Sequence, residues 1–337
     1  MNIITHLKER LFCRILDKRK RSNPFDEQSA ELFTPPADAD EFHNNSYYFS
    51  CHDMAGNSLL LRHAQRGANT TEVWLAYKDA KGNAYINEKQ RFVGEAPPSS
   101  VSCTEVAKTW AFSYNGKLKN MKTGKQVSAN IGCEFSATGD IFEFGHHLDS
   151  RVLAKSIAKE KWSRAFFSAL RENNQTHYEQ PGKVNASITI GGKSTDLKLP
   201  AMRDHSFGKR DWNYMNKHFW LMALFEDGSH LNANMVSYPA VKRLETGYYV
   251  GKKTLCVQEA KLDGDMPSKG VPESFSYRAK LTSGKDIAVN CKREMTFEFP
   301  FGGYTIYEGI GTFELNGKKG RGVLEFGYND DPNRVTS

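Results

Sequence analysis

The sequence predicts an all-β protein made of two consecutive antiparallel β-barrels joined by one packed helix. Short apolar stretches with alternating polar residues are separated by Gly and Asn turn signals, which is typical of antiparallel strands. One strong helical pattern lies near the middle of the chain, with strand-rich segments of similar length on both sides. A chain of 337 residues, 39% of them hydrophobic, can also bury two cores.

Residues 1–24 are predicted to form an amphipathic basic helix. Leu7, Leu11 and Ile15 recur at helical spacing in a stretch that is too charged to span a bilayer and lacks the apolar core of a signal peptide. Three roles stay open: packing on the protein itself, peripheral contact of residues 1–21 with a membrane, and organelle targeting. Glu9 and Asp17 weaken the targeting alternative.

Residues 25–150 are predicted to form the N-terminal barrel-like domain. A lead-in rich in Pro and Asp comes first. Val73, Leu75 and Tyr77 then alternate toward one face before a Lys81-Gly82-Asn83 turn, which predicts a strand that enters a hairpin.

Residues 151–173 are predicted to form the linking helix. Large apolar residues and alanines build a broad stripe on one side of it, behind a helix cap at Asp149 or Ser150. The stripe predicts that this helix packs on the protein.

Residues 174–335 are predicted to form the C-terminal barrel-like domain. Its first hairpin turns at Gly191-Gly192. The letters "GGKS" there look like the end of a phosphate-binding loop, but Ser187 occupies the position of the required first glycine, so the hairpin is favoured. A second hairpin is predicted around Asp227-Gly228, the favoured pair of a two-residue type I′ turn.

The register of this second hairpin predicts a ligand cavity. With a two-residue turn, one face carries the side chains of Phe219, Leu221, Phe225, His230, Asn232 and Asn234. Large apolar side chains do not suit a solvated surface, and amides without partners do not suit a core filled by side chains alone. The wall of a cavity for an apolar ligand accommodates both kinds of side chain. Phe207 and Trp212 complete the predicted ligand-binding set. The alternative is a structural polar network inside the barrel.

The stretch "MRDHSFGKRDW", residues 202–212, combines two Arg-Asp pairs with a histidine and two aromatic residues. We expect it to close the second barrel and to present His205 to the cavity. The structural alternative is that its Arg-Asp pairs hold a loop across the barrel end.

Three segments resemble a known family: "HYEQPGKV" at 177–184, the stretch 202–212, and "YEGIGTFELNGKKGRGVLEFGY" at 307–328. They are similar to the double-calycin group of carotenoid 1,2-hydratases, AttH-like proteins and Diels–Alderases, over about residues 45–330. The most similar members are uncharacterised proteins named for a relation to phosphoenolpyruvate synthase. The resemblance implies two calycin (lipocalin-like) barrels, an apolar ligand, and no organic cofactor.

The resemblance also implies which residues act. In the hydratases of this group, a histidine and an acidic residue on a following strand transfer protons to an isoprenoid double bond. His205 falls at the histidine, but Asn232 or Asn234 falls at the acidic position. An amide cannot donate a proton as a carboxylic acid does, so the chain departs from the hydratase pattern.

Three more residues are candidate catalytic groups near the cavity: Asp204, His177 and Glu179. Strand alternation puts His177 and Glu179 on one face of "HYEQ" and the intervening residues on the other. Burial would tune the pKa of such groups for proton transfer.

Composition limits the other classes of function. The net charge is +7, but Lys and Arg are spread along the chain, so we expect no nucleic-acid partner. Six cysteines without a CxxC pair predict neither a zinc site nor a disulfide framework and favour the cytoplasm, with a membrane-peripheral alternative. No metal site is predicted, and the oligomeric state stays open.

The sequence therefore supports two classes of function. The first is a cofactor-free lyase, isomerase or cyclase that acts on an isoprenoid, polyketide or similar apolar molecule. The second is a non-catalytic carrier, sensor or chromophore-binding protein with the same cavity. A third, weaker alternative is an accessory module related to phosphotransferase-linked proteins.

Overall fold

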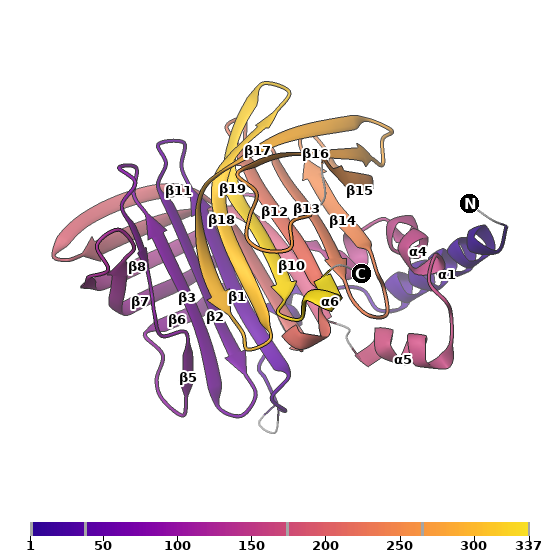
Figure 1. The fold of residues 1–337 in the computed structure, drawn as a ribbon, viewed down its shortest axis with the longest axis horizontal. Helices are drawn as coiled ribbons and strands as arrows, with labels where there is room; N and C mark the ends of the chain where they lie inside the picture. The colour runs from indigo at the N-terminus through magenta and orange to yellow at the C-terminus, as the bar shows by residue number, and fades with distance from the viewer. Residues whose placement is uncertain (1–2, 37–38, 173–174, 264–265, 336–337) are drawn as a thin grey trace. The chain divides into compact units, whose positions relative to one another are not determined.

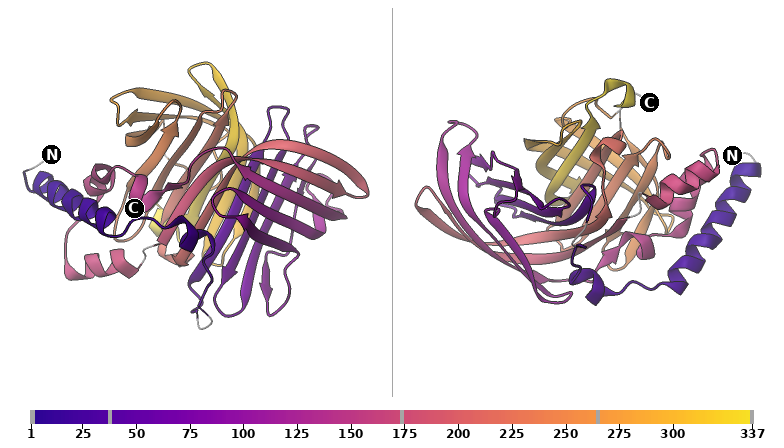
Figure 2. Two further views of the ribbon diagram at one scale, coloured as in Figure 1. Left: turned by 180° about the vertical axis from the view of Figure 1, so that it is seen from behind. Right: turned by 90° about the horizontal axis from the view of Figure 1, so that it is seen from below.

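The computed structural model describes residues 3–36, 39–172, 175–263 and 266–335 and divides into two compact units, each built around one barrel (Figure 1). The first-barrel unit comprises Asp26–Phe144 and Gln175–Arg210. The second-barrel unit comprises Met1–Phe25, Gly145–Asn174 and Asp211–Ser337. Figure 2 shows the strands of each barrel from two further sides.

The first-barrel unit consists of one short helix and eleven strands among its described residues. They are α2 (Glu27–Glu31), β1 (His43–His52), β2 (Ser58–Arg66), β3 (Thr70–Lys78), β4 (Ala84–Ile86), β5 (Arg91–Val93), β6 (Ser99–Glu105), β7 (Thr109–Asn120), β8 (Gln126–Ala137), β9 (Phe142–Glu143), β10 (Gln175–Ile190) and β11 (Lys193–Lys209). Eight of them follow the order β11-β1-β2-β3-β4-β7-β8-β10, and pairing of β10 with β11 closes the ring.

Two predicted hairpins of this unit are confirmed. Strand β3 pairs with β4 after the predicted turn, and its alternating residues Val73, Leu75 and Tyr77 lie in the core. Gly191 and Gly192 connect β10 and β11 with φ of 57° and 80°, as a type I′ turn requires of both central residues. The letters "GGKS" therefore belong to a hairpin.

The predicted boundary between the barrels is wrong. The C-terminal domain was expected to begin at residue 174, but β10 and β11 belong to the first barrel, where β11 pairs with β1 from Ala201 to Lys209. Only six strands of this ring precede residue 150, so the N-terminal segment cannot close an eight-stranded barrel alone. The predicted ranges also include residues 1–2, 37–38, 173–174 and 264–265, which lie outside the described residues.

The second-barrel unit contains a closed barrel and most of the helices. Its elements are α1 (Ile3–Ser22), α4 (Ser150–Ala158), α5 (Arg164–Glu172), η1 (Trp212–Tyr214), β12 (Lys217–Phe225), β13 (His230–Ser237), β14 (Leu244–Val250), β15 (Thr254–Leu262), β16 (Ser274–Leu281), β17 (Asp286–Pro300), β18 (Tyr304–Leu315), β19 (Lys318–Asn329) and α6 (Pro332–Val335). The short helix α3 (Phe144–His147) begins at the last residue assigned to the first-barrel unit. The two barrels confirm the predicted all-β class.

The helices differ in part from the prediction. The basic N-terminal helix is present as α1. The single helix predicted at 151–173 is two helices, because Ser163 caps α5 by accepting from the amide of Phe166, and Trp162 donates to the last turn of α4 at Ile157. Asp149 is the cap of α4. No helix among the described residues is both long and apolar enough to cross a bilayer.

The predicted register of the second hairpin is also wrong, by one residue. Leu224 pairs with His230, and the amide of Phe225 donates to the carbonyl of Ser229, which leaves three loop residues, 226–228. Gly228 supplies the positive φ of 81° that such a three-residue loop needs at its end. A shift of one residue moves every side chain of a strand to the other face.

We expect the second barrel to be sensitive to added volume at Gly322. A Cβ there would lie 1.8 Å from the carbonyl oxygen of Met222, whereas a Cβ at Gly132, on β8, would meet nothing within 4 Å. Gly322→Ala should therefore lower the free energy of unfolding by about 1–3 kcal/mol. Urea unfolding measures it, with Gly132→Ala as the matched control that should leave stability unchanged or slightly higher. Equal effects of the two changes would contradict this packing.

Candidate functional site

Strands β10 and β11 carry four polar side chains into the interior of the first barrel. Tyr178 pairs with His205 and Gln180 pairs with Arg203, so all four share one face of the hairpin. Arg203 donates from Nε and from a terminal nitrogen to Oε1 of Gln180, at 2.9 and 2.6 Å. The opposite face carries His177 and Glu179, as the sequence predicts.

A carboxylate from outside the predicted set completes this group. Glu31, the last residue of α2, is buried and lies 2.7 Å from both the guanidinium of Arg203 and the hydroxyl of Tyr178. Its other oxygen accepts from the indole nitrogen of Trp110 at 2.8 Å and from the amide of Ala107 at 3.2 Å. These charge-assisted bonds offset the cost of burying the carboxylate.

Helix α2 is a short element with one clear start signal. Asp26 caps it by accepting from the amides of residues 28 and 29. Phe33, just beyond the helix, stacks on Phe207 of β11 with ring centroids 4.1 Å apart. We call residues 26–36 the strap, because α2 and Phe33 hold this segment on residues of β7, β10 and β11.

Aromatic rings surround His205. The ring of Tyr47 stacks on the imidazole at 4.2 Å, and the rings of Tyr178 and Phe207 lie at 5.1 and 5.2 Å. His205 is fully buried. Burial, together with the charges of Arg203 and His177, lowers the pKa of His205 well below its usual range.

The hydroxyl of Tyr178 connects His205 to Glu31. It lies 2.7 Å from Oε1 of Glu31 and 2.5 Å from Nδ1 of His205. A phenol has one proton and can donate to only one of these partners. The other contact is a hydrogen bond only when His205 carries a proton on Nδ1 or Glu31 is itself protonated.

Asn45 determines how many protons this chain holds. Its Oδ1 lies 2.7 Å from Nε2 of His205, and in this orientation Nε2 donates to it. A neutral imidazole then has no proton for Nδ1, so the chain takes up one extra proton. With the amide turned by 180°, Asn45 donates to Nε2, Nδ1 donates to Tyr178, and Tyr178 donates to Glu31. The amide nitrogen of Asn45 also donates to Oε1 of Gln65 at 2.9 Å, so the Gln65 amide must turn with it. The two protonation states thus differ in the orientation of both amides.

A second cluster lies on the opposite face of the β10–β11 hairpin. Nε2 of His177 is 3.2 Å from Oδ2 of Asp204 and 3.7 Å from Oε1 of Glu179. Burial alone would lower the pKa of His177, but the two carboxylates outweigh it and raise that pKa. The ligand atoms of the three residues lie within 4.8 Å of one another, a spacing that could hold a metal ion.

The predicted catalytic set therefore divides between two faces. His205 lies inside the barrel, whereas Asp204, Glu179 and His177 lie together on the other side of its wall. The pair of Arg203 with Asp204 suggested by the sequence does not form, because Arg203 pairs with Glu31. Neighbours on a strand point to opposite faces, so Arg203 and Asp204 cannot meet.

The predicted ligand-binding residues are not brought together. Phe219, Leu221 and Phe225 point into the second barrel and belong to its hydrophobic core. Because of the register, His230, Asn232 and Asn234 lie on its other face, where the amide nitrogen of Asn234 donates to Oδ1 of Asn232 at 2.8 Å. Burial lowers the pKa of His230 to about 4.

The two aromatic residues of that set lie in different units. Phe207 belongs to β11, next to His205. Trp212 begins η1 and stacks on Phe301 and Tyr304 at 4.9 and 5.9 Å. The prediction that Phe207 lies near the histidine is therefore correct. Its predicted place in the second barrel is wrong, because β11 belongs to the first.

Sequence reasoning missed Glu31, Tyr178, Asn45 and Trp110 as members of the group. The start of α2 at Asp26 was readable as a helix cap, but no local pattern shows that Glu31 enters a barrel closed by residues more than 140 positions later. Such long-range pairing is not visible in one sequence.

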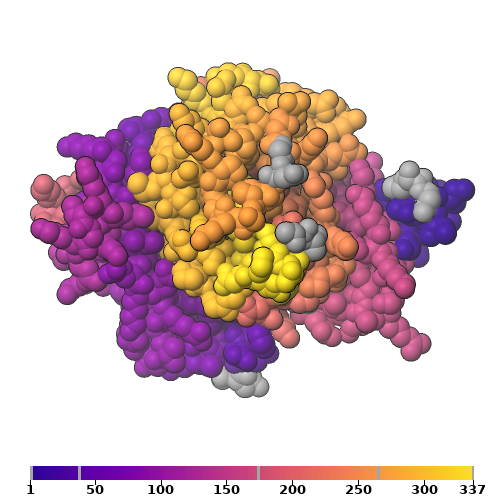
Figure 3. Space-filling model, viewed as in Figure 1, coloured from indigo at the N-terminus to yellow at the C-terminus, as the bar shows by residue number. Residues whose placement is uncertain are grey.

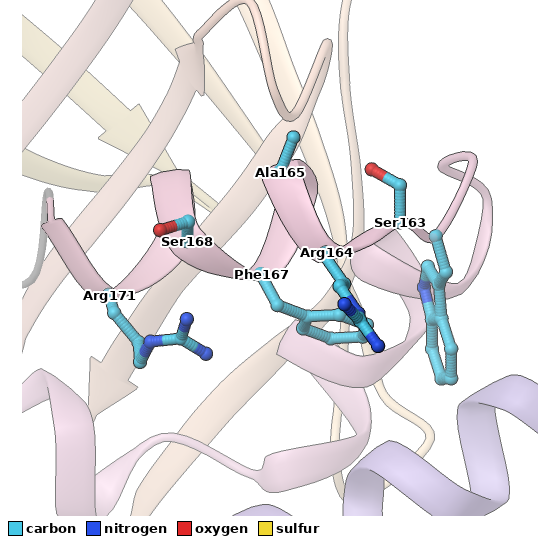
Figure 4. Close-up of a pocket in the computed structure, with 7 residues that line it drawn as sticks. Ser163, Arg164, Ala165, Phe167, Ser168 and Arg171 are labelled. Carbon is cyan, nitrogen blue, oxygen red and sulfur yellow. The ribbon is translucent and has the colours of Figure 1, made fainter.

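Two open grooves lie away from this group. One, of about 790 Å³, runs along α5 and is lined by Trp162, Phe167 and their neighbours (Figure 4). The other, of about 470 Å³, lies between residues 87–98 and the β7–β8 region. Neither groove is lined by a predicted site residue.

Known proteins share this architecture. An AttH-like protein from Nitrosomonas europaea superimposes with a TM-score of 0.56 at 13% identity, over 88% of this chain and 95% of that one. Kievitone hydratase from Nectria haematococca gives 0.54 at 12% identity, over 92% and 97%. CghA, solved with Sch210972, gives 0.52 at 8% identity, over 86% and 89%. These likenesses confirm the double-calycin, AttH-like fold.

In sequence, the family model described as "Domain of unknown function (DUF7064)" matches residues 27–330. No curated protein matches the chain. The similarity to proteins named for phosphoenolpyruvate synthase stays a prediction.

Removing Glu31 should destabilise the first barrel. Glu31→Ala leaves the buried guanidinium of Arg203 without its ion pair, which should cost about 3–5 kcal/mol of unfolding free energy. Urea unfolding followed by fluorescence measures it. Glu27→Ala, at the exposed start of the same helix, is the control and should change stability by less than about 0.5 kcal/mol. Similar losses in both variants would contradict a structural ion pair.

His205 should stay neutral in the folded protein at pH 6.5, the usual pKa of a histidine. Its pKa lies below 6.5 when folded, so the unfolded state binds more protons as the pH falls below about 6.5, and stability decreases there. His205→Asn should flatten this decrease by up to about 1.4 kcal/mol per pH unit, and the exposed His6→Asn should not. Nitrogen NMR shifts of the ring report the charge directly, and an imidazolium at pH 6.5 would contradict the prediction.

Proposed function

We propose that this chain, which belongs to the DUF7064 family, binds an apolar small molecule in its first barrel and acts on it without a cofactor, as a lyase, isomerase or cyclase. The observation that carries the proposal is the buried chain Glu31–Tyr178–His205, with a cation beside it and aromatic rings around it. The kievitone hydratase named above has the same two-barrel fold, which supports small-molecule chemistry on this scaffold.

The proposed chemistry is proton transfer. To add a proton to a double bond, or to remove one from a C–H group, a site needs an acid and a base whose pKa values are tuned by burial. Asn232 and Asn234 cannot supply the acid, but Glu31 is a carboxyl group two hydrogen bonds from His205. Glu31 thus takes the acidic role that the sequence seemed to lack.

Each residue of the group has a distinct proposed role. His205 exchanges a proton with the substrate, and Tyr178 passes it to or from Glu31. Arg203 holds the Glu31 carboxylate in place. The two orientations of the Asn45 amide, with the Gln65 amide turning alongside, let the chain hold or release one proton.

The surroundings of His205 support an apolar class of substrate. The rings of Tyr47, Trp110 and Phe207 face the imidazole and offer aromatic surface. An isoprenoid, polyketide or similar apolar molecule fits such walls. Because His205 is fully buried, a substrate can reach it only if residues around it move.

A second candidate function is binding without turnover. The observation that favours it is that both ring nitrogens of His205 already have protein partners, Tyr178 and Asn45. A carrier, sensor or chromophore-binding protein would use the same barrel and would leave its ligand unchanged.

The first experiment identifies the ligand. Native mass spectrometry of the protein purified from a lipid-rich host, followed by organic extraction, should reveal one apolar molecule per chain. Chemically altered product after incubation with that molecule supports the enzyme, and quantitative recovery of the unchanged molecule supports the carrier.

Tyr178→Phe then tests the relay. It removes one hydroxyl and keeps the ring, so ligand affinity should stay within about two-fold while turnover falls by about 10²-fold or more. Tyr114→Phe is the matched control, because its hydroxyl donates to the carbonyl of Lys117 instead and should not affect turnover. Undiminished turnover in Tyr178→Phe would rule out the relay.

A further inference from the structure

Helix α1 exposes an apolar row that the fold does not cover. Of the nine large hydrophobic side chains exposed among the described residues, five lie on α1, with exposed fractions from 49% to 81%. They are Ile3, Ile4, Leu7, Leu11 and Ile15. Single exposed apolar residues are ordinary, but a contiguous row is typical of an interaction surface.

The charges beside this row have one sign. Five basic residues of α1 are exposed with it: Arg10, Arg14, Lys18, Arg19 and Arg21. Both acidic residues of the helix, Glu9 and Asp17, are only partly exposed, on the side that packs against the protein. The outward face of α1 is therefore apolar and positive, without a carboxylate.

The opposite face of α1 already holds the helix on its own unit. Phe12 packs against Trp162 and Phe167, with ring centroids 6.1 and 6.4 Å apart. Lys8 donates to the carbonyl of Glu160 at 2.8 Å, and Lys20 donates to that of Leu148. The helix therefore packs on the protein, which was one of the roles that the sequence left open. The exposed row takes no part in this packing.

The groove along α5 lies next to this helix. Its lining includes Trp162 and Phe167, the two rings that Phe12 contacts, and also Arg164 and Arg171 (Figure 4). Figure 3 shows α1, in indigo, beside the magenta surface of the helical segment. Tryptophan and arginine are favoured where a protein meets the headgroup layer of a bilayer.

We propose that the outward face of α1 docks on a membrane rich in anionic phospholipid, with the helix lying in the plane of the headgroups. The aliphatic row would enter the acyl boundary and the basic residues would meet lipid phosphates and carboxylates. This proposal is independent of the chemistry in the first barrel.

Vesicle co-sedimentation of the full chain tests it. We expect binding to phosphatidylcholine vesicles that contain 30% phosphatidylserine, and at least ten-fold weaker binding to pure phosphatidylcholine. Leu7→Gln with Leu11→Gln should weaken binding to the anionic vesicles about ten-fold or more. Val93→Gln with Met121→Gln removes two exposed apolar side chains from the first-barrel unit and should have no effect.

A charge variant separates the two contributions. Arg10→Gln, Arg14→Gln and Lys18→Gln together should abolish the preference for anionic vesicles, whereas Lys81→Gln, Lys122→Gln and Lys193→Gln, exposed elsewhere, should keep it. Circular dichroism confirms that each variant is folded.

Absence of vesicle binding, or binding that does not depend on vesicle charge, would overturn the proposal. A third outcome would also overturn it: the wild type is a dimer that does not bind vesicles, and the Leu7→Gln, Leu11→Gln variant is a monomer. The apolar row would then contact a second copy of the chain.

Discussion

The buried ion pair between Glu31 and Arg203 is the interaction on which the interior of the first barrel depends. A charged pair out of water is costly unless all its hydrogen bonds are satisfied. Here four N–H and O–H groups donate to the carboxylate, and the guanidinium also binds Gln180. The pair joins the strap to the two strands that close the ring. It also fixes the oxygen that orients Tyr178, and through it His205.

Much of the fold could be predicted from the sequence, because it depends on local rules. Alternation and paired glycines located the β3–β4 and β10–β11 hairpins, and Asp149 capped a helix as expected. The errors arose where a local rule had two outcomes. Asp227-Gly228 suits a two-residue turn and also a three-residue loop that ends in glycine, and only packing decides between them.

The candidate site was predictable only in part, for a related reason. His205 and the faces of "HYEQ" followed from the motif and from strand alternation, and both hold in the structure. The place of Glu31 in the site could not be predicted, because Glu31 comes from a short helix in a segment that looked like a linker. Its partners at 178 and 203 lie far along the chain, so nothing near Glu31 in the sequence marks it as buried. The carboxylate precedes the histidine in the chain and does not lie on the strands that follow it.

Closure of the first barrel by β10 and β11 has a consequence for how the protein is made. On the ribosome, β1 and β8 emerge with open edges, and their partners follow only after the helices α4 and α5 have been synthesised. At about 5–20 residues per second, the edge of β8 stays unpaired for about 3–10 s and that of β1 for about 8–30 s. Unpaired edges invite pairing with other chains, so the nascent first barrel is a stage at which a chaperone would protect the protein. A fragment that ends near residue 150 would keep both edges open permanently and would be prone to aggregate.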